Sequence, residues 1–169
     1  MFKSAKYIYG VICLLIMNAC GMYSFTGASI PAEAKTVSVA TFENKASLVE
    51  PTLAQTLTDE LRDKFVSQST LDLVNTDGDL RFEGEIVSYS TKPIAIQGDQ
   101  TAAMNRLTIT IKVTFINVFD EKKSFENSSF SRYEDYPSTE DLSAVQESLI
   151  KTIVDALVDD VFNKAVVNW

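Results

Sequence analysis

Hydrophobic and polar residues alternate along four stretches of the chain, and a period of two residues is typical of half-buried β-strands. These stretches are residues 35–42, 80–89, 106–119 and 124–133. The third stretch is the most regular. The fourth follows it after a polar turn, so the two can pair as an antiparallel hairpin. Four strands are therefore expected.

Two irregularities are expected in this sheet. Phe125 and Phe130 have opposite parity within the last stretch, which indicates a bulge or a strand with two apolar faces. Residues 91–105 interrupt the alternation with proline, glycine and small polar residues, and they predict a long loop. Ile94 and Ile96 lie in this loop and require a cover, which either a partner or a helix of the same domain could supply.

Apolar residues at helical spacing predict two helices. Ser47 and Glu50 have the spacing of a capping box and Pro51 falls in the first turn, so the first helix is expected to begin there. Its apolar stripe consists of Leu53, Leu57, Leu61 and Phe65. The second helix is expected over residues 142–162, where a wider set of apolar positions predicts a well-covered helix.

The order of these elements is β-α-β-β-β-α. We expect an α+β domain in which two helices pack on one face of a four-stranded, mostly antiparallel sheet. The chain has 169 residues, which is enough for one core and leaves little room for a second domain. Residues 35–169 are expected to form this single domain.

The composition excludes several classes of function. The chain carries 15 basic and 23 acidic residues, for a formal net charge of −8, and it contains no histidine. A nucleic-acid partner is not expected, because a phosphate backbone repels an acidic protein. Without histidine there is no Ser-His-Asp triad, no Cys-His pair and no histidine-ligated zinc. We expect no catalytic residues, no metal site and no bound cofactor.

The first segment has the form of a secretory signal peptide. Lys3 and Lys6 precede an apolar run over residues 7–17. This run is about half of the roughly 20 residues that a membrane-spanning helix needs, so removal of the segment is favoured over a permanent span. Residues 1–19 are therefore expected to be absent from the mature protein.

The end of this segment resembles the lipobox of bacterial lipoproteins. Residues 17–21 read Met-Asn-Ala-Cys-Gly, and in a lipobox the cysteine thiol receives diacylglycerol before cleavage. Cys13 would be removed with the signal peptide, which leaves Cys20 as the first residue and without a disulfide partner. We expect a covalent lipid on Cys20 and a leader over residues 20–34 that tethers the domain to a membrane.

Short patterns along the mature chain resemble the family of lipopolysaccharide-assembly lipoproteins, LptE. The patterns lie in residues 20–25, 27–30, 53–65 and 79–86 and in the strand that contains Thr110. Residues 157–169 look like the branch of that family found in Bacteroidetes.

This resemblance implies a small α+β lipoprotein at the periplasmic face of the outer membrane. Such a protein plugs a large β-barrel, LptD, helps the barrel to assemble and assists delivery of lipopolysaccharide to the outer leaflet. It catalyses no reaction. Gly21 fits this location, because it is not the aspartate that signals inner-membrane retention in enteric lipoproteins.

Three basic residues are candidate lipopolysaccharide ligands. The resemblance implies that basic residues on the sheet contact lipopolysaccharide phosphates, which Arg and Lys suit by charge and donor geometry. Arg106 and Lys112 project from one face of the same strand, about 20 Å apart, and Lys92 lies in the preceding loop. Ordinary solubilising charges on a solvated strand are the alternative.

Two other functions stay open. One is a free periplasmic lipoprotein that binds lipid or glycan, because the same export and fold signals would fit it. The other is an enzyme that uses carboxylates alone, since Glu83 and Glu85 face the same way with about 7 Å between their Cα atoms. A solvent-facing strand with alternating charges explains this pair better.

Overall fold

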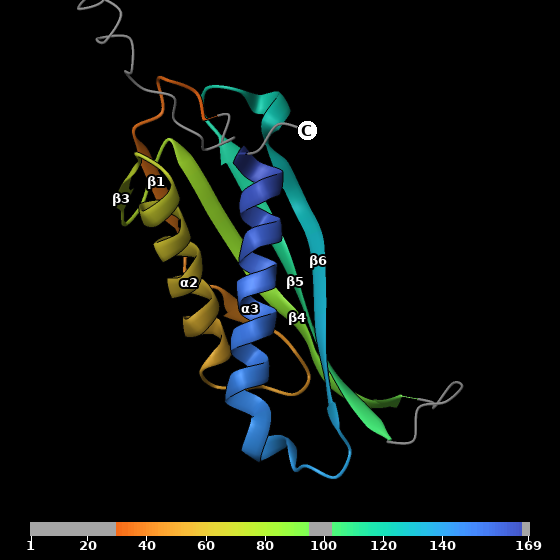
Figure 1. Cartoon of the computed structure of the whole chain (residues 1–169). Coiled ribbons are helices and arrows are strands. Elements are labelled where there is room, and N and C mark those ends of the chain that lie inside the picture. Colours follow the sequence, from red (N-terminus) through yellow and green to blue (C-terminus); the bar gives the residue numbers. More distant parts are fainter. Residues whose placement is uncertain (1–29, 95–102, 167–169) are drawn as a thin grey trace, which may run out of the picture.

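The computed structural model describes residues 30–94 and 103–166, which form one mixed sheet and two α-helices (Figure 1). The elements are β1 (Thr36–Val39), β2 (Glu43–Asn44), α2 (Leu53–Gln68), β3 (Asp72–Val74), β4 (Leu80–Ile94), β5 (Met104–Asn117), the 3-10 turn η1 (Glu121–Lys123), β6 (Phe125–Pro137) and α3 (Leu142–Val166). The predicted signal peptide and Cys20 lie outside the described residues. Among the described helices, none is long and apolar enough to cross a membrane.

Both helices lie on the same face of the sheet, as Figure 1 shows, and this confirms the expected α+β class. The strand order is β3-β1-β4-β5-β6, with β2 also paired to β4. β4, β5 and β6 are antiparallel, whereas β1 is parallel to both β3 and β4. The long antiparallel strands therefore make up one side of the sheet and the short parallel strands the other.

The sheet has six strands in the described residues, where the alternation predicted four. β2 has two residues and β3 has three, so neither is long enough to show a period of two. The parallel pairing of β1 and β3 follows from α2, because the chain crosses over the sheet through this helix before it returns beside β1.

The hairpin between β4 and β5 is longer than expected. Pairing continues as far as Ile94 and Met104, so the expected loop over 91–105 is wrong at both of its ends. The register shifts between Ile86 and Ser88, and this bulge changes the parity of β4 and hides the alternation beyond it. Ile94 is half-buried in the strand, and Ile96 lies outside the described residues.

The first helix begins later than the capping-box pattern predicts. Ser47 lies in a bend, and α2 starts at Leu53 after Thr52, whose side chain makes no capping hydrogen bond. The carboxylate of Glu50 accepts hydrogen bonds from the backbone N–H of Thr52 at 3.4 Å and from its hydroxyl at 3.0 Å. The capping-box prediction is therefore wrong, because Glu50 folds forward onto Thr52 instead of back onto Ser47.

The expected irregularity in the last strand is confirmed. The register between β5 and β6 shifts between Val113 and Phe115, and Asn127 has a positive φ of 48°. The one extra residue of this bulge in β6 brings both Phe125 and Phe130 against the buried core, although their parity differs. Their ring centroids lie 6.2 Å apart.

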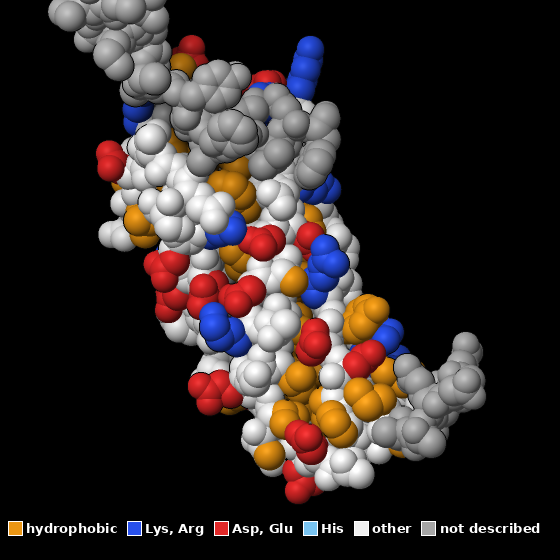
Figure 2. Space-filling view, viewed as in Figure 1, with side chains coloured by type: hydrophobic (Ala, Val, Ile, Leu, Met, Phe, Trp, Pro, Cys, Tyr) orange, Lys and Arg blue, Asp and Glu red, His pale blue; other side chains and the backbone are white. Residues whose placement is uncertain are grey.

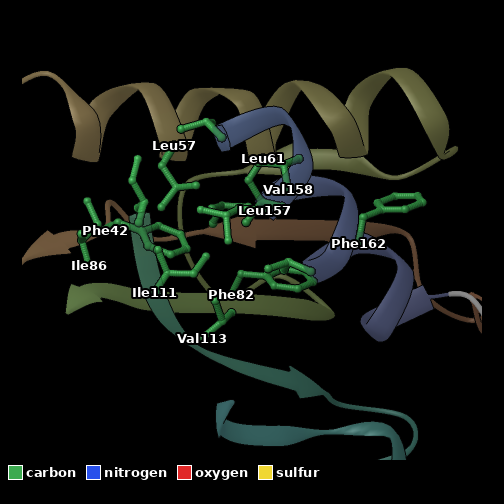
Figure 3. Packing of buried hydrophobic residues seen from close by; sticks show 14 of the residues in the cluster. Phe42, Leu57, Leu61, Phe82, Ile86, Ile111, Val113, Leu157, Val158 and Phe162 are labelled. Atoms are coloured by element: carbon green, nitrogen blue, oxygen red, sulfur yellow. The ribbon is translucent and has the colours of Figure 1, made fainter. Parts of the chain in front are cut away.

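The core lies between the sheet and the two helices (Figure 3). Phe65 of α2 packs on Phe82 of β4 at 4.8 Å between ring centroids and on Phe162 of α3 at 5.0 Å. Phe82 in turn stacks on Phe115 of β5 at 4.7 Å. Each of these elements contributes a phenylalanine, so one continuous aromatic row joins both helices to the middle of the sheet.

Candidate binding face

The second face of the sheet carries no helix in the described part of the chain (Figure 1), and we refer to it as the open face. Its side chains come from every second position of β4, β5 and β6, between the buried positions that face the helices. All three of the predicted basic residues lie on this face, since Lys92 pairs with Arg106 and Lys112 has the parity of Arg106. The strand β4, not a loop, positions Lys92.

Arg106 is held by two side chains of β6. Its Nε donates to Asp135 Oδ1 at 2.7 Å and its second terminal nitrogen donates to Asp135 Oδ2 at 2.9 Å. The guanidinium carbon also lies 3.5 Å from the ring centroid of Tyr133, which is a cation–π contact. The hydrogen bond with Asp135 raises the pKa of Arg106, and the same bond lowers the pKa of Asp135.

Lys92 lies directly opposite Arg106 across the β4–β5 pairing, and Asp135 lies opposite Arg106 on the other side. Two cations and one carboxylate thus form a row across three strands. Like charges at directly opposed positions repel each other, and Asp135 offsets this repulsion for Arg106. Lys92 is exposed and has no ion pair with any residue in 30–94 or 103–166. This end of the open face is therefore positive.

Lys112 lies in a second row, opposite Glu85 of β4 and Ser129 of β6. It contributes to a shallow hollow of about 280 Å³ on the open face, where Lys45 and Glu43 also lie. Lys45 Nζ contacts Glu85 at 2.7 Å and Glu43 at 3.0 Å. The hydrogen bond from Lys45, followed by weaker attraction to Lys45 and Lys112, lowers the pKa of Glu85. Charge in this row is thus nearly balanced.

Between the two charged rows, the open face consists of hydroxyl side chains. They occupy two further rows across β4, β5 and β6, formed by Ser90, Thr108 and Tyr133 and by Ser88, Thr110 and Ser131. The hydroxyls of Thr110 and Ser131 lie 2.9 Å apart. Hydroxyls both donate and accept hydrogen bonds, so this strip can bind sugar or phosphate oxygens between the cations.

The helix-covered side is less suited to an anionic ligand. Figure 2 shows acidic side chains gathered over α2 on this side, where the sequence of the helix places Asp59 and Asp63 at exposed positions. A larger hollow of about 570 Å³ between α2 and the start of α3 has Glu50, Glu60 and Glu147 among its lining residues. Repulsion by these carboxylates leaves the open face as the better surface for phosphate.

Several functional groups were not predicted from the sequence. Tyr133 and Asp135 fix Arg106, and Lys45 binds Glu85, which is one of the two carboxylates that suggested an enzyme. The parity of the last strand could have placed Tyr133 and Asp135 on the face of Arg106, but the bulge in that strand obscures it. Within the described residues, no group of three acidic or cysteine side chains could hold a metal ion.

Comparisons with known proteins identify a family and a fold. Residues 34–165 match the family described as LptE, lipopolysaccharide-assembly. No curated protein matches the chain. A hypothetical protein from Chlamydia trachomatis is similar in structure, with a TM-score of 0.54 and 9% identity over 80% of this chain and 99% of that one.

Two further solved structures have the same fold. Lipoprotein B from Nitrosomonas europaea has a TM-score of 0.53 and 11% identity, over 83% of this chain and 86% of that one. A protein from Xanthomonas campestris has a TM-score of 0.51 and 11% identity, over 80% and 87%. At these identities the likeness extends to the fold alone. The family match, by contrast, runs from just before β1 to the last turn of α3, and on this basis the chain belongs to the LptE family of lipopolysaccharide-assembly proteins.

Proposed function

We propose that this protein is a lipid-anchored, non-catalytic subunit of the machinery that delivers lipopolysaccharide to the outer leaflet of the outer membrane. The family match over residues 34–165 is the observation that carries this proposal. In this role the domain plugs an LptD-type β-barrel from the periplasmic side and helps the barrel to assemble. The resemblance of residues 157–169 supports a place in the Bacteroidetes branch.

The proposed anchor is a lipid on Cys20, at the periplasmic face of the outer membrane. The lipobox pattern over residues 17–21 supports it. Acyl chains contribute about 0.8 kcal/mol for each buried CH₂, so the two or three chains of a lipoprotein would hold the domain stably at the membrane. The domain's net charge is negative, so attraction to anionic lipid would not replace this anchor.

The proposed ligand surface for lipopolysaccharide is the open face, with Lys92, Arg106 and Lys112 as the residues that contact phosphate. Lys92 and Arg106 lie side by side at one end, where they can bind one phosphate together. The hydroxyl strip leads from them towards Lys112, about 20 Å along β5. A phosphorylated glycolipid matches this arrangement of cations and hydroxyls.

The partner is tested by affinity purification of the full-length protein with a C-terminal tag from outer membranes in mild detergent. We expect a large β-barrel and lipopolysaccharide to co-purify with the wild type. Replacement of Cys20 by alanine should reduce recovery of this complex, because the protein is no longer held at the membrane. A correctly lipidated protein that purifies alone would contradict the plug role and favour a free periplasmic binding lipoprotein.

The ligand surface is tested with the double variant Lys92→Gln, Arg106→Gln in the purified complex. We expect lipopolysaccharide binding to weaken by roughly tenfold, because two charge-assisted contacts are lost. Arg81→Gln is a matched control: Arg81 also lies on β4, and its side chain is 39% exposed against 36% for Arg106. Equal losses in the control and the double variant would argue against a specific site.

A further inference from the structure

The turn between β5 and β6 lies at the end of the domain where the described chain begins (Figure 1). Asp79 joins this turn to the start of β1 through hydrogen bonds to both. Its backbone oxygen accepts a hydrogen bond from the N–H of Val118 at 3.1 Å, and its carboxylate accepts one from the N–H of Lys35 at 2.8 Å. The turn and the start of β1 are therefore neighbours.

The end of β5 and the turn that follows it expose three apolar side chains, which we name the apolar tip: Ile116, Val118 and Phe119. They are 40%, 53% and 48% exposed, whereas the loop between β2 and α2 exposes two large apolar side chains, Leu48 and Val49. Scattered single apolar residues on a surface are ordinary, but a cluster on one turn favours an interaction site.

The apolar tip is a fixed structure. The side chain of Asn117 is buried, with only 4% of the residue exposed, and its Oδ1 accepts hydrogen bonds from the N–H groups of Phe119 at 3.0 Å and Asp120 at 3.1 Å. The backbone N–H of Asn117 donates to Ser124 Oγ at 2.9 Å across the turn. These bonds hold Val118 and Phe119 outward, so little entropy is lost when they contact a partner.

The position of the proposed anchor identifies the partner. Ile30 is the first described residue and Cys20 precedes it by ten positions, which span at most about 35 Å even when fully extended. A lipid on Cys20 would therefore hold the start of the domain, and the turn beside it, within this distance of the bilayer. The adjoining turn, residues 120–123, contains two acidic and two basic residues, so its local charge does not repel a lipid surface.

We propose that the apolar tip inserts into the interfacial region of the phospholipid leaflet that holds the lipid anchor, and so orients the domain on the membrane. This inference rests on the proposed lipidation of Cys20. The apolar face of an interfacial amphipathic helix buries about 5–10 Å into the boundary between headgroups and acyl chains, and we expect a similar depth for the apolar tip.

The test uses the mature, lipidated full-length protein in phosphatidylcholine–phosphatidylglycerol vesicles. Trp169 is the single tryptophan of the sequence, and Trp169→Phe removes it. Phe119→Trp then reports on the tip, and Leu48→Trp is the matched control, because Leu48 is also exposed, at 56%, but lies in the loop between β2 and α2. Quenching of each tryptophan by phospholipids brominated on their acyl chains is measured.

We expect the tip tryptophan to be quenched at least about twofold more strongly than the control and to emit at shorter wavelength. If mass spectrometry shows the acyl chains but both tryptophans are quenched equally, the membrane contact of the tip is overturned. The proposed anchor is then unaffected. A mass without acyl chains would overturn the anchor and the tip contact together, so the two failures are distinguishable. A Val118→Cys variant labelled with an environment-sensitive fluorophore gives a second readout, since Cys20 would be blocked by its lipid.

Discussion

Arg106 is fixed in place by its neighbours on β6 and not by burial. Asp135 makes a two-point contact with the guanidinium, whose carbon lies 3.5 Å from the ring centroid of Tyr133. A long side chain that is already restricted loses less entropy when it binds an anion. The open face therefore provides a guanidinium that is already held in place, Arg106, with the exposed ammonium group of Lys92 beside it.

The first prediction concerns pH and Asp135. The pKa of this carboxyl is lowered in the folded protein, chiefly because it accepts hydrogen bonds from Arg106. The unfolded chain has an aspartate pKa of about 3.9, so above this pH the ionised carboxylate of Asp135 stabilises the folded state. This stabilisation is lost as the pH falls through the lower pKa that Asp135 has in the folded protein. Between pH 7 and pH 2, urea denaturation should therefore show a steeper loss of stability for the wild type than for Asp135→Asn. Parallel curves would contradict the role of the ion pair.

The second prediction concerns Thr58, which is completely buried in α2. Its hydroxyl accepts a hydrogen bond from the backbone N–H of Phe42 at 3.0 Å and donates to the carbonyl of Ala54 at 2.6 Å. Thr58→Val preserves the shape but leaves the Phe42 N–H unpaired, which should lower the free energy of unfolding by about 1–3 kcal/mol.

Thr56→Val is the control for this change. The hydroxyl of Thr56 also bonds to a carbonyl four residues earlier in the chain, at 3.0 Å, but this bond is exposed to water. We expect a loss of less than about 0.5 kcal/mol for the control in the same denaturation experiment. A similar cost at both positions would mean that the Phe42 N–H finds another partner.

Among the elements, the β4–β5 hairpin carries most of the candidate binding face. Its paired residues extend from Leu80 and Asn117, at the end where β1 begins, to Ile94 and Met104 at the other end. Because both strands are continuous over this length, the Lys92–Arg106 row and the Lys112 row have a fixed spacing. A loop over 91–105 would not have fixed it.

The third prediction concerns Gly84, where β4 meets the loop after β1. A Cβ at this position would lie 2.3 Å from Cε1 of Phe42 and 2.9 Å from the backbone oxygen of Lys112. The ring of Phe42 is buried and the second contact is with backbone, so Gly84→Ala should reduce the free energy of unfolding by about 1–3 kcal/mol.

This prediction is checked by chemical denaturation, with Glu83→Ala in the same strand as the control. Glu83 is exposed, so its replacement should change stability by less than about 0.5 kcal/mol. If Gly84→Ala were as stable as the control, the close approach of Phe42 to β4 would not exist in solution.

At the scale of the whole domain, the two ends of the sheet differ in chemistry. The apolar tip and the start of β1 are at one end, and the Lys92–Arg106 row is about 34 Å away along β5. In the proposed arrangement the first end contacts the membrane, and the hydroxyl strip leads from the Lys112 row to the most positive part of the open face. The domain's long axis would then point away from the anchor.

The fourth prediction concerns the single core that joins both ends. Phe162 of α3 is 5% exposed and packs on Phe65 of α2. Phe162→Ala should lower the free energy of unfolding by about 3–5 kcal/mol. Unfolding should also stay cooperative, with coincident transitions by circular dichroism and by near-ultraviolet absorbance, because both helices share this core. Separate transitions would show that α3 unfolds independently.

The sequence by itself determined the class of the fold and most of its long elements. Alternation over 80–89 and 106–119 requires a sheet with one buried face, and the wide apolar face after residue 142 requires a covered helix. An irregularity between Phe125 and Phe130 was predictable from their opposite parity, but the sequence left open whether it was a bulge or a strand with two apolar faces. The basic residues at 92, 106 and 112 were also identifiable, although their role as ligands stays a prediction.

Only the tertiary structure decided what depends on contacts between distant residues. β2 and β3 are too short to have a periodic signal, and they are strands because β1 and β4 supply their hydrogen bonds. The bulge after Ile86 shifted the parity of β4, so the position of Lys92 opposite Arg106 was not visible in the sequence. The pairing of Arg106 with Asp135 joins residues 29 positions apart. The position of the apolar tip beside the start of the domain likewise depends on the tertiary structure, because Asp79 bonds to both Val118 and Lys35.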